Sequence, residues 1–350
     1  ASLLETLSPR NITLLFRLLP KELAAETFTF MDSDTQMHLI SGFSDKELRE
    51  ILDEIFVDDT VDIIEEMPAN VVSRILKNTD AETRKQINAI LDYPTDSAGS
   101  VMTTEYVYLH KNMTTKEALD WIRKVGVVKE TIYTCYITES RKLIGFVTIL
   151  DLVTADEDAT IESIMDSNVK FVYTHEDRED VAKKFSKYDF LAMPVVDNEE
   201  RMVGIITFDD VLDVIAEENE EDFSKMAAMQ PIEDSYFKTS VFTHAKKRIG
   251  WLLVLMLSAT ITGNLLTKYE EAFQAIPILV SFIPMLMSTG GNCGSQSSTT
   301  VIRGLATGEI QFKDFFKAVF KEFRISLIIS VILAVTNGLR IFIFYKNVVS

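Results

Sequence analysis

Apolar residues in the first hundred positions recur at intervals of three and four, which is the period of helices that bury one face. Prolines stand where such helices would begin, as at Pro9 and Pro20, because proline fits the first turn of a helix. Short acidic links separate the apolar runs, for example Leu48, Ile51, Leu52, Ile55 and then Val61, Ile63, Ile64, Met67. The pattern predicts an all-α N-terminal domain at residues 1–98, built as a small solenoid-like stack of helices.

From residue 99 onward the pattern changes to short runs of apolar and β-branched residues that alternate with helical stretches. Two copies of a unit of roughly 60 residues follow each other. Each copy predicts a β-α-β-β-α order and ends in Gly-h-h-Thr-x-x-Asp, where h is apolar, at residues 145–151 and 204–210. We therefore expect an α/β pair at 99–208, divided into about 99–160 and 161–208.

The two copies resemble a tandem pair of CBS domains. In that family a nucleotide such as ATP or AMP lies in the cleft between the repeats, and the Thr and Asp of the closing motif contact its ribose. A hydroxyl and a carboxylate at the end of a strand suit a vicinal diol. The resemblance implies candidate nucleotide-binding residues, with two aromatic surfaces on which a base could stack: Thr148, Asp151, Thr207, Asp210, Tyr133 and Phe190. The alternative is a repeat with a purely structural role.

An acidic segment follows the second repeat. Residues 209–223 contain neither Pro nor Gly, which predicts one continuous helix. Along it, carboxylates recur at intervals of three and four, at Asp210, Asp213, Glu217 and Glu221. Carboxylates about 6 Å apart repel by roughly 1 to 3 kcal/mol at intermediate dielectric, and a divalent cation between them reverses the sign. The alternative is a solvated acidic face. We take 209–245 as an acidic connecting helix and linker.

The N-terminal domain has its own pair of carboxylates, Asp58 and Asp62, which are four residues apart and so share one face of a predicted helix. For Asp58 or Asp59 taken alone, we favour a helix cap, since an Asp at a helix start satisfies free N–H groups and the dipole. Asp62 would already lie inside the helix. For that residue, contact with a cation competes with the structural interpretation.

Long apolar runs dominate the last hundred residues. The first has about 18 residues without a charge, which is enough to cross a bilayer. We expect a transmembrane domain at 246–350 with spans near 249–267, 272–288 and 325–344, the second containing Pro277 and Pro284. Basic residues at 246–248 and between the second and third spans place the acidic part in the cytoplasm by the positive-inside rule.

The second apolar run stops at a stretch of glycines and small polar residues, 288–298. Broken backbone at membrane depth must line water or protein. Because Mg²⁺ is reluctant to lose its water, polar groups here are candidates for contact with a hydrated ion. The candidate residues of this ion path are Ser288, Gly290, Gly291, Asn292, Gly294 and Gln296. The alternative is close helix packing through small residues.

Charge and composition exclude several classes of protein. The net charge is −18, which argues against nucleic acid as a partner, and carboxylates outnumber Lys and Arg by about three to one in residues 156–222. The four histidines are scattered, with no Walker A sequence or zinc spacing, so we expect no enzyme. Cys135 and Cys293 are too far apart to suggest a disulfide. No signal peptide is visible, and since the chain opens without Met, a few leading residues are expected to be absent.

The complete order of elements resembles the MgtE family of magnesium channels or transporters. The order comprises a helical N-terminal domain, a CBS pair, an acidic connecting helix and a span that leads into Pro-h-h-x-x-Thr-Gly-Gly-Asn-x-Gly-x-Gln at 284–296. The resemblance implies a homodimer in the cell (inner) membrane, with its pore between the membrane domains and the acidic helix as a plug. Cytosolic Mg²⁺ would lock the plug shut, and ATP is a candidate modulator.

By match to family positions, the resemblance implies a set of Mg²⁺-sensing carboxylates, to which the acidic stripe adds Glu217: Asp58, Asp62, Asp177, Glu179, Asp189, Asp210, Asp213, Glu218, Glu221 and Asp222. The family has five spans with a pore carboxylate in the fifth, whereas three spans are visible here, so we expect part of the pore to lie outside this sequence. A different class of function is also open, a membrane-tethered CBS sensor of adenine nucleotides without transport.

Overall fold

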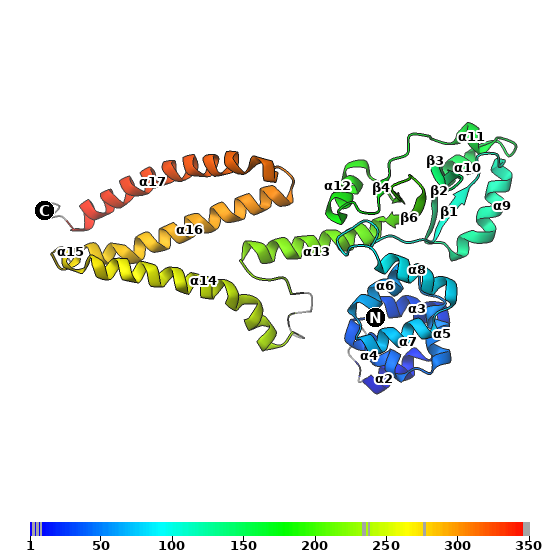
Figure 1. Cartoon of the computed structure of the whole chain (residues 1–350), viewed down its shortest axis with the longest axis horizontal. Coiled ribbons are helices and arrows are strands. Elements are labelled where there is room, and N and C mark those ends of the chain that lie inside the picture. The colour runs from blue at the N-terminus through cyan, green and yellow to red at the C-terminus, as the bar shows by residue number, and fades with distance from the viewer. Residues whose placement is uncertain are drawn as a thin grey trace. The chain divides into compact units, whose positions relative to one another are not determined.

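The computed structural model describes residues 1, 4, 7, 9–232, 236, 239–275 and 278–345. It divides into two compact units, which we call the N-terminal unit (Ala1–Ile215) and the C-terminal unit (Ala216–Ser350). Pro277 of the predicted second span lies outside the described residues. Figure 1 labels the elements of both units.

The N-terminal domain is all-α, as the period of its apolar residues predicts. Buried aromatic rings join its helices: Phe16 lies with its ring centroid 6.1 Å from Phe28 and 5.5 Å from Phe43. Polar caps fix where helices begin, and Ser44 forms a capping box with Glu47. The helices are α2 (Pro9–Phe16), α3 (Lys21–Thr29), α4 (Ser33–Gly42), α5 (Asp45–Leu52), α6 (Val57–Glu66), α7 (Ala69–Asn78) and α8 (Ala81–Leu91).

The α/β pair is confirmed as two copies of one unit. In each sheet a first strand pairs parallel with a second, and the second pairs antiparallel with a third. The first copy contains β1 (Tyr106–Leu109), α9 (Thr115–Val125), η1 (Gly126–Val128), β2 (Thr131–Glu139), β3 (Lys142–Thr148) and α10 (Ile149–Thr154). The second contains α11 (Ile161–Ile164), β4 (Val172–Tyr173), α12 (Arg178–Tyr188), β5 (Ala192–Val196) and β6 (Met202–Thr207), and it leads into α13 (Phe208–Met226).

The helical domain shares a hydrophobic core with the second repeat but not with the first. One continuous core runs from the helical domain through Met102 into the second repeat, where it includes Val195 and Ile206. The first repeat has a core of its own, around Leu109 and Ile137. Apolar burial therefore fixes the second repeat to the helical domain more directly than it fixes the first.

The glycine of each closing motif allows two segments to cross closely. Thr103, which precedes the first repeat, exchanges backbone hydrogen bonds of 2.8 and 2.9 Å with Ile205 in β6 of the second. A Cβ on Gly204 would lie 2.7 Å from the Thr103 carbonyl oxygen. The same crossing joins Asp166 to Phe146 beside Gly145. The repeats thus exchange their leading segments. The second crossing is less tight than the first, since a Cβ on Gly145 would lie 3.0 Å from the Asp166 carbonyl oxygen.

Substituting Gly204 with alanine should reduce the free energy of unfolding by about 1 to 3 kcal/mol, because backbone cannot yield as a flexible side chain can. Gly42→Ala is the matched control, since its Cβ would meet only Thr13 at 3.7 Å. Urea unfolding of both variants gives the comparison. Equal stability of the two variants would contradict the close crossing.

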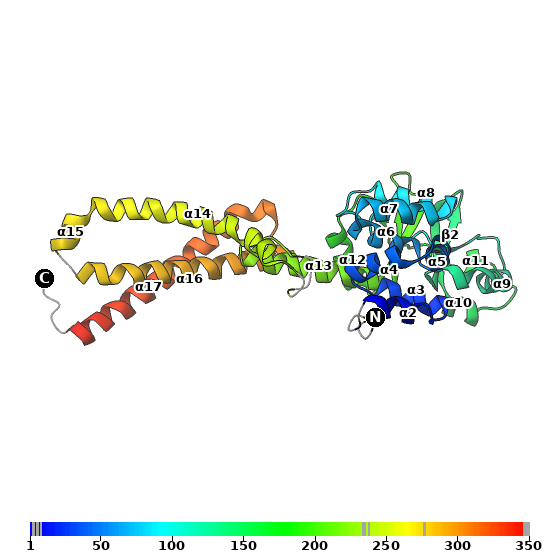
Figure 2. The same ribbon diagram turned by 90° about the horizontal axis from the view of Figure 1, so that it is seen from below.

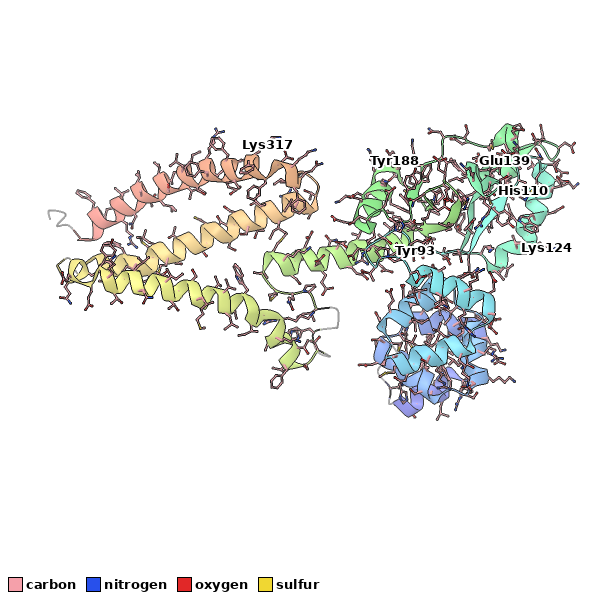
Figure 3. All side chains as sticks on the ribbon, viewed as in Figure 1. Tyr93, His110, Lys124, Glu139, Tyr188 and Lys317 are labelled. Carbon is pink, nitrogen blue, oxygen red and sulfur yellow. The ribbon has the colours of Figure 1, made fainter. Side chains whose placement is uncertain are left out.

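The C-terminal unit consists of long helices joined at alternating ends (Figures 1 and 2). Within its described residues it contains α14 (Val241–Lys268), α15 (Glu270–Ala275), α16 (Ile278–Ala306), η2 (Phe312–Asp314) and α17 (Phe315–Tyr345). In the described part of the chain, α14 is the helix that is long and apolar enough to cross a membrane, and none of that apolar window is buried in the structure. Figure 3 shows side chains projecting outward along these helices. The second and third spans stay predictions.

The expectation of broken backbone at 288–298 is wrong. Helix α16 runs without interruption from Ile278 to Ala306 and contains Pro284. A glycine costs roughly 1 kcal/mol against alanine but does not stop a helix that its flanking residues favour. A Cβ on Gly290, Gly291 or Gly294 would meet no atom within 4 Å in the described chain, so close packing through these residues is not observed there either. Their role in an ion path remains a prediction.

Candidate functional site

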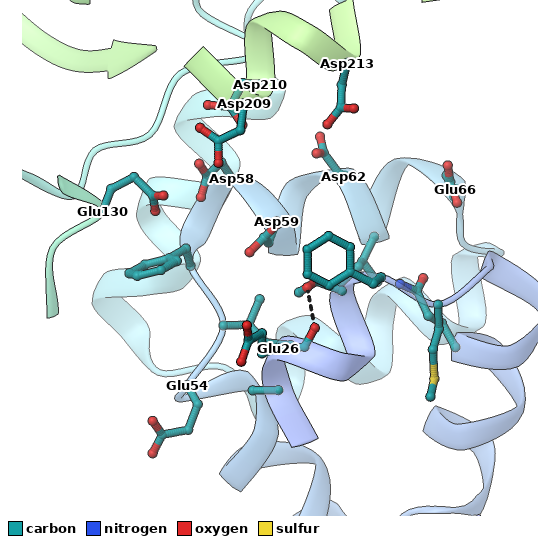
Figure 4. A pocket seen from close by; sticks show the side chains of 18 of the residues that line it. Glu26, Glu54, Asp58, Asp59, Asp62, Glu66, Glu130, Asp209, Asp210 and Asp213 are labelled. Carbon is teal, nitrogen blue, oxygen red and sulfur yellow. Dashed lines mark hydrogen bonds between the residues drawn. The ribbon is translucent and has the colours of Figure 1, made fainter. Parts of the chain in front are cut away.

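The N-terminal unit contains an acidic cavity of about 600 Å³ between α3, α6 and the start of α13. Eleven of its nineteen described lining residues are carboxylates, and none of the nineteen is Lys, Arg or His. Figure 4 shows carboxylates of α6 and α13 facing one another across it. The lining carboxylates are Glu22, Glu26, Glu54, Asp58, Asp59, Asp62, Glu66, Glu130, Asp209, Asp210 and Asp213. We call this the acidic cavity.

The first turn of α6 supplies Asp58 and Asp59. The N-cap of this helix is Phe56, which makes no side-chain cap bond, so the interpretation of Asp58 or Asp59 as the cap is wrong. The helix begins at Val57, two positions earlier than a cap at Asp58 would place it, and Val57 and Val61 are buried. The two carboxylates instead lie beside the positive end of the helix dipole and point into the cavity (Figure 4).

The first turns of α13 supply the opposite wall. The backbone N–H and the hydroxyl of Thr207 both donate to one oxygen of Asp210, which holds that carboxylate at the helix start. Asp209 and Asp213 are exposed on the same stretch. Four of the predicted sensing carboxylates, Asp58, Asp62, Asp210 and Asp213, line this one cavity. Their role in sensing Mg²⁺ stays a prediction.

Two carboxylates that sequence reasoning missed complete the site from the first repeat. Glu105 directly precedes β1 and Glu130 directly precedes β2, and the Glu130 N–H donates to the Glu105 carbonyl at 2.9 Å. Each offers an oxygen to a group with Asp58 in which all three oxygens lie within 4.8 Å of one another. A signal was present, since the starts of neighbouring parallel strands share one edge of a sheet and an acid stands before each.

The carboxylates of the cavity destabilise one another's charge. Burial raises the pKa of Asp58 well above its ordinary value, and the charges of Asp210 and Glu130 raise it further. Burial with neighbouring carboxylates raises the pKa of Glu130 to about 7. Burial raises the pKa of Asp210 to about 6, although its bonds from Thr207 oppose the shift. A cation in this cavity would reverse these repulsions.

Other predicted sensing carboxylates lie elsewhere. Asp177 caps α12 by accepting the Glu179 N–H at 2.9 Å, and Glu179 pairs with Lys183 at 2.8 Å. Neither residue lines the acidic cavity. Four more lie on α13 beyond the boundary of the N-terminal unit, where Glu221 pairs with Lys225 at 2.8 Å: Glu217, Glu218, Glu221 and Asp222.

A second, smaller cleft of about 200 Å³ lies between the two repeats. Thr148 and Phe190 of the predicted nucleotide site line it together with Lys170, and so does Asp189, which the sequence placed among the metal-sensing residues. The hydroxyl of Thr148 donates to Asp151 at 2.6 Å. We call this the repeat cleft.

The remaining nucleotide candidates do not line the repeat cleft. Tyr133 is 62% exposed, and Thr207 with Asp210 belongs to the acidic cavity or its edge. The sequence treated the two closing motifs as equivalent. In the fold, the first motif, with Thr148, faces the repeat cleft. The second motif, with Asp210, faces the carboxylates of α6.

Three family descriptions match successive parts of the chain. They are the MgtE intracellular N domain over residues 1–96, CBS domains over 98–158 and 161–217, and a divalent cation transporter over 283–350. Among solved structures, the cytosolic domain of the Mg²⁺ channel MgtE in complex with ATP is similar, with a TM-score of 0.58 and 36% identity. That similarity covers 61% of this chain and 88% of the other.

Whole relatives match as well. The chain is 29% identical over 360 residues to the magnesium transporter MgtE of Bacillus subtilis, covering 99% of this chain and 79% of the relative. It is 34% identical over 322 residues to the magnesium transporter MgtE of Thermus thermophilus, covering 91% of this chain and 71% of the relative. With a helical domain, a CBS pair and a transporter region in the same order, the chain belongs to the MgtE family.

Proposed function

We propose that this protein carries Mg²⁺ across the cell membrane and that cytosolic Mg²⁺ bound in the acidic cavity closes it. The observation that carries the proposal is the cavity itself, in which carboxylates of three elements converge with no basic residue among the described lining. Oxygen ligands of this kind suit Mg²⁺, which keeps several waters and binds through a few carboxylates. The names of the relatives support Mg²⁺ as the transported ion.

The acidic cavity gives Mg²⁺ a way to act on α13. A cation between Asp58 or Asp62 and Asp210 or Asp213 would hold the start of α13 against α6. Without the cation, repulsion between the two walls favours their separation. Because α13 continues as one helix to Met226, a change at its start reaches residues well beyond the cavity. We propose that this helix acts as the plug.

The magnitudes allow such a switch. A site that binds only the closed state stabilises it by about 1.4 kcal/mol at ten times its dissociation constant. Moving an equilibrium from mostly open to mostly closed takes about 5.5 kcal/mol. About four such sites are therefore enough, and eleven carboxylates line the cavity. Glu217, Glu218, Glu221 and Asp222 on α13 would add further ligands.

The C-terminal unit is proposed to form the transport path as part of a homodimer in the bilayer. Helix α14 has no buried residues, so its apolar side chains are left for lipid or for a second copy. Ser288, Asn292 and Gln296 stand at intervals of four on α16 and therefore share one face of that helix. We propose that this face contacts the hydrated ion.

The repeat cleft is proposed to take an adenine nucleotide. Thr148 lines the cleft at the end of β3, and its hydroxyl donates to Asp151, so the pair offers the ribose a hydroxyl with a carboxylate next to it. Phe190 offers an aromatic face in the same cleft, and Lys170 supplies a positive charge for phosphate. ATP in the related cytosolic domain supports this choice of ligand. Binding between the repeats would bias the Mg²⁺ switch by favouring one arrangement of the two copies.

Ion flux tests the proposal against a membrane-tethered nucleotide sensor. The native protein in liposomes should pass Mg²⁺ when the cytoplasmic side holds little Mg²⁺, and the flux should fall as Mg²⁺ is added there. ATP should shift the Mg²⁺ concentration at which flux falls. Nucleotide binding without any flux would support the sensor instead, and flux that ignores cytoplasmic Mg²⁺ would overturn the role of the cavity.

A further inference from the structure

We infer that Asp58, Glu105 and Glu130 form a separate site in which a divalent cation is bound directly by carboxylate oxygens, rather than through its water shell. The site lies where the acidic cavity meets the first repeat. The inference rests on the proposed function and specifies the chemistry of one part of the same region. We call these residues the inner triad.

The separation of the oxygens fits a directly bound ion. One oxygen from each residue lies within 4.8 Å of the other two. Three oxygens spaced evenly around one ion are about 3.5 to 3.6 Å apart for Mg²⁺ and about 4.0 to 4.5 Å apart for Ca²⁺, from the usual metal–oxygen distances. A shift of roughly 1 Å between the oxygens is therefore enough to bring all three onto one divalent ion.

Burial supplies the second, independent observation. Asp58 Oδ1, Glu105 Oε2 and Glu130 Oε2 each expose less than 1 Å² and have no hydrogen-bond partner among the described residues. A buried oxygen of a charged group without a donor is costly, and three together are costlier. Lys129 and the Val57 backbone partly balance Glu105, and the Asp59 backbone partly balances Asp58. A cation would satisfy all three orphan oxygens at once.

The rest of the acidic cavity has a different character. Asp62, Asp209 and Asp213 are exposed, so an ion near them keeps its water. The inner triad excludes water from its three oxygens. The two regions should therefore bind divalent ions with different affinities and with different numbers of coordinated waters.

The inner triad also joins two parts that share no hydrophobic core, the helical domain and the first repeat. Asp58 belongs to the helical domain, whose core continues into the second repeat, whereas Glu105 and Glu130 open the two parallel strands of the first repeat, which has its own core. A cation in the triad would therefore fix the first repeat to α6. The outer carboxylates of α6 and α13 would instead act on the start of α13.

Manganese provides a probe, because free Mn²⁺ gives an electron paramagnetic resonance signal that is lost on binding. The full chain in detergent should bind Mn²⁺ in a tight and a weaker class, with fewer waters on the tight ion by pulsed measurements in deuterated water. The variant Glu105→Gln with Glu130→Gln should weaken the tight class at least tenfold. The matched control, Asp62→Asn with Asp213→Asn, should weaken the other class and keep the tight one.

An unchanged tight class in the triad variant, or a tightly bound ion with a full water shell, would overturn the inner triad. Thermal unfolding in EDTA checks the fold, and removing like charges should raise the unfolding temperature rather than lower it. If the double variant does not fold, Glu130→Gln alone serves the same comparison. Failure of the proposed function is distinguishable, because a protein without flux can still lose its tight Mn²⁺ class in the variant.

Discussion

Replacing Asp210 and Asp213 with asparagine is expected to leave Mg²⁺ flux open at cytoplasmic Mg²⁺ concentrations that close the unmodified protein. The two carboxylates form the α13 wall of the acidic cavity and face Asp58 and Asp62. In the variant, a cation in the cavity still has carboxylate ligands on α6, but positions 210 and 213 of α13 no longer supply any. Each tenfold loss of affinity at one site removes about 1.4 kcal/mol of bias toward the closed state, so we expect the closing concentration to rise at least tenfold in a liposome flux assay.

A second pair provides the control with the same change in charge. Asp177 and Glu179 were predicted from the sequence as sensing residues too, but they lie outside the cavity, one as a helix cap and the other paired with Lys183. Asp177→Asn with Glu179→Gln should leave the closing concentration within about twofold of the unmodified protein. Equal effects of both pairs would mean that net charge, rather than the cavity, sets the response.

The second large effect is a pH dependence of stability that Mg²⁺ removes. In EDTA, the free energy of unfolding should fall as the pH rises from about 5 to about 8, because burial raises the pKa of Asp210 to about 6 and that of Glu130 to about 7. A carboxylate with a raised pKa holds its proton longer in the folded state than in the unfolded state. The free energy of unfolding therefore falls progressively once the pH passes the ordinary pKa of the unfolded state. The loss is complete above the raised pKa of the folded state.

Saturating Mg²⁺ should flatten this profile above pH 7, since the ion replaces the protons among the same oxygens. Glu47 and Asp80, whose pKa values are lowered by bonds from Ser44 and Thr83, act in the opposite direction but only below their ordinary values of 4.5 and 3.8. Urea unfolding at a series of pH values, with EDTA or Mg²⁺, measures the effect. The variant Glu130→Gln with Asp210→Asn should reduce the slope in EDTA, and the part that remains belongs to Asp58, whose pKa burial also raises. An unchanged slope would locate the titrating groups elsewhere.

The pattern of residues was enough to determine the elements of this protein and their order. Apolar positions at intervals of three and four became α2 to α8, and the repeated Gly-h-h-Thr-x-x-Asp motif ended β3 and β6. A run of 15 residues without Pro or Gly became part of one helix, α13. These properties are local, because helix caps, period and backbone breakers act within a few residues.

Which carboxylates meet was decided by the tertiary structure. Asp58 and Asp210 are far apart in the chain, and only the shared core of the helical domain and the second repeat brings α6 against α13. Glu105 and Glu130 become neighbours because β1 and β2 are parallel, and neither local sequence contains that pairing. Local patterns also misled at 288–298, where the flanking residues carry the helix through the glycines. The pattern of charges also predicted metal-binding carboxylates that do not line the cavity. The free-energy cost of ionising a carboxylate depends on its burial and on neighbouring charges from other elements, and no single segment of sequence contains that information.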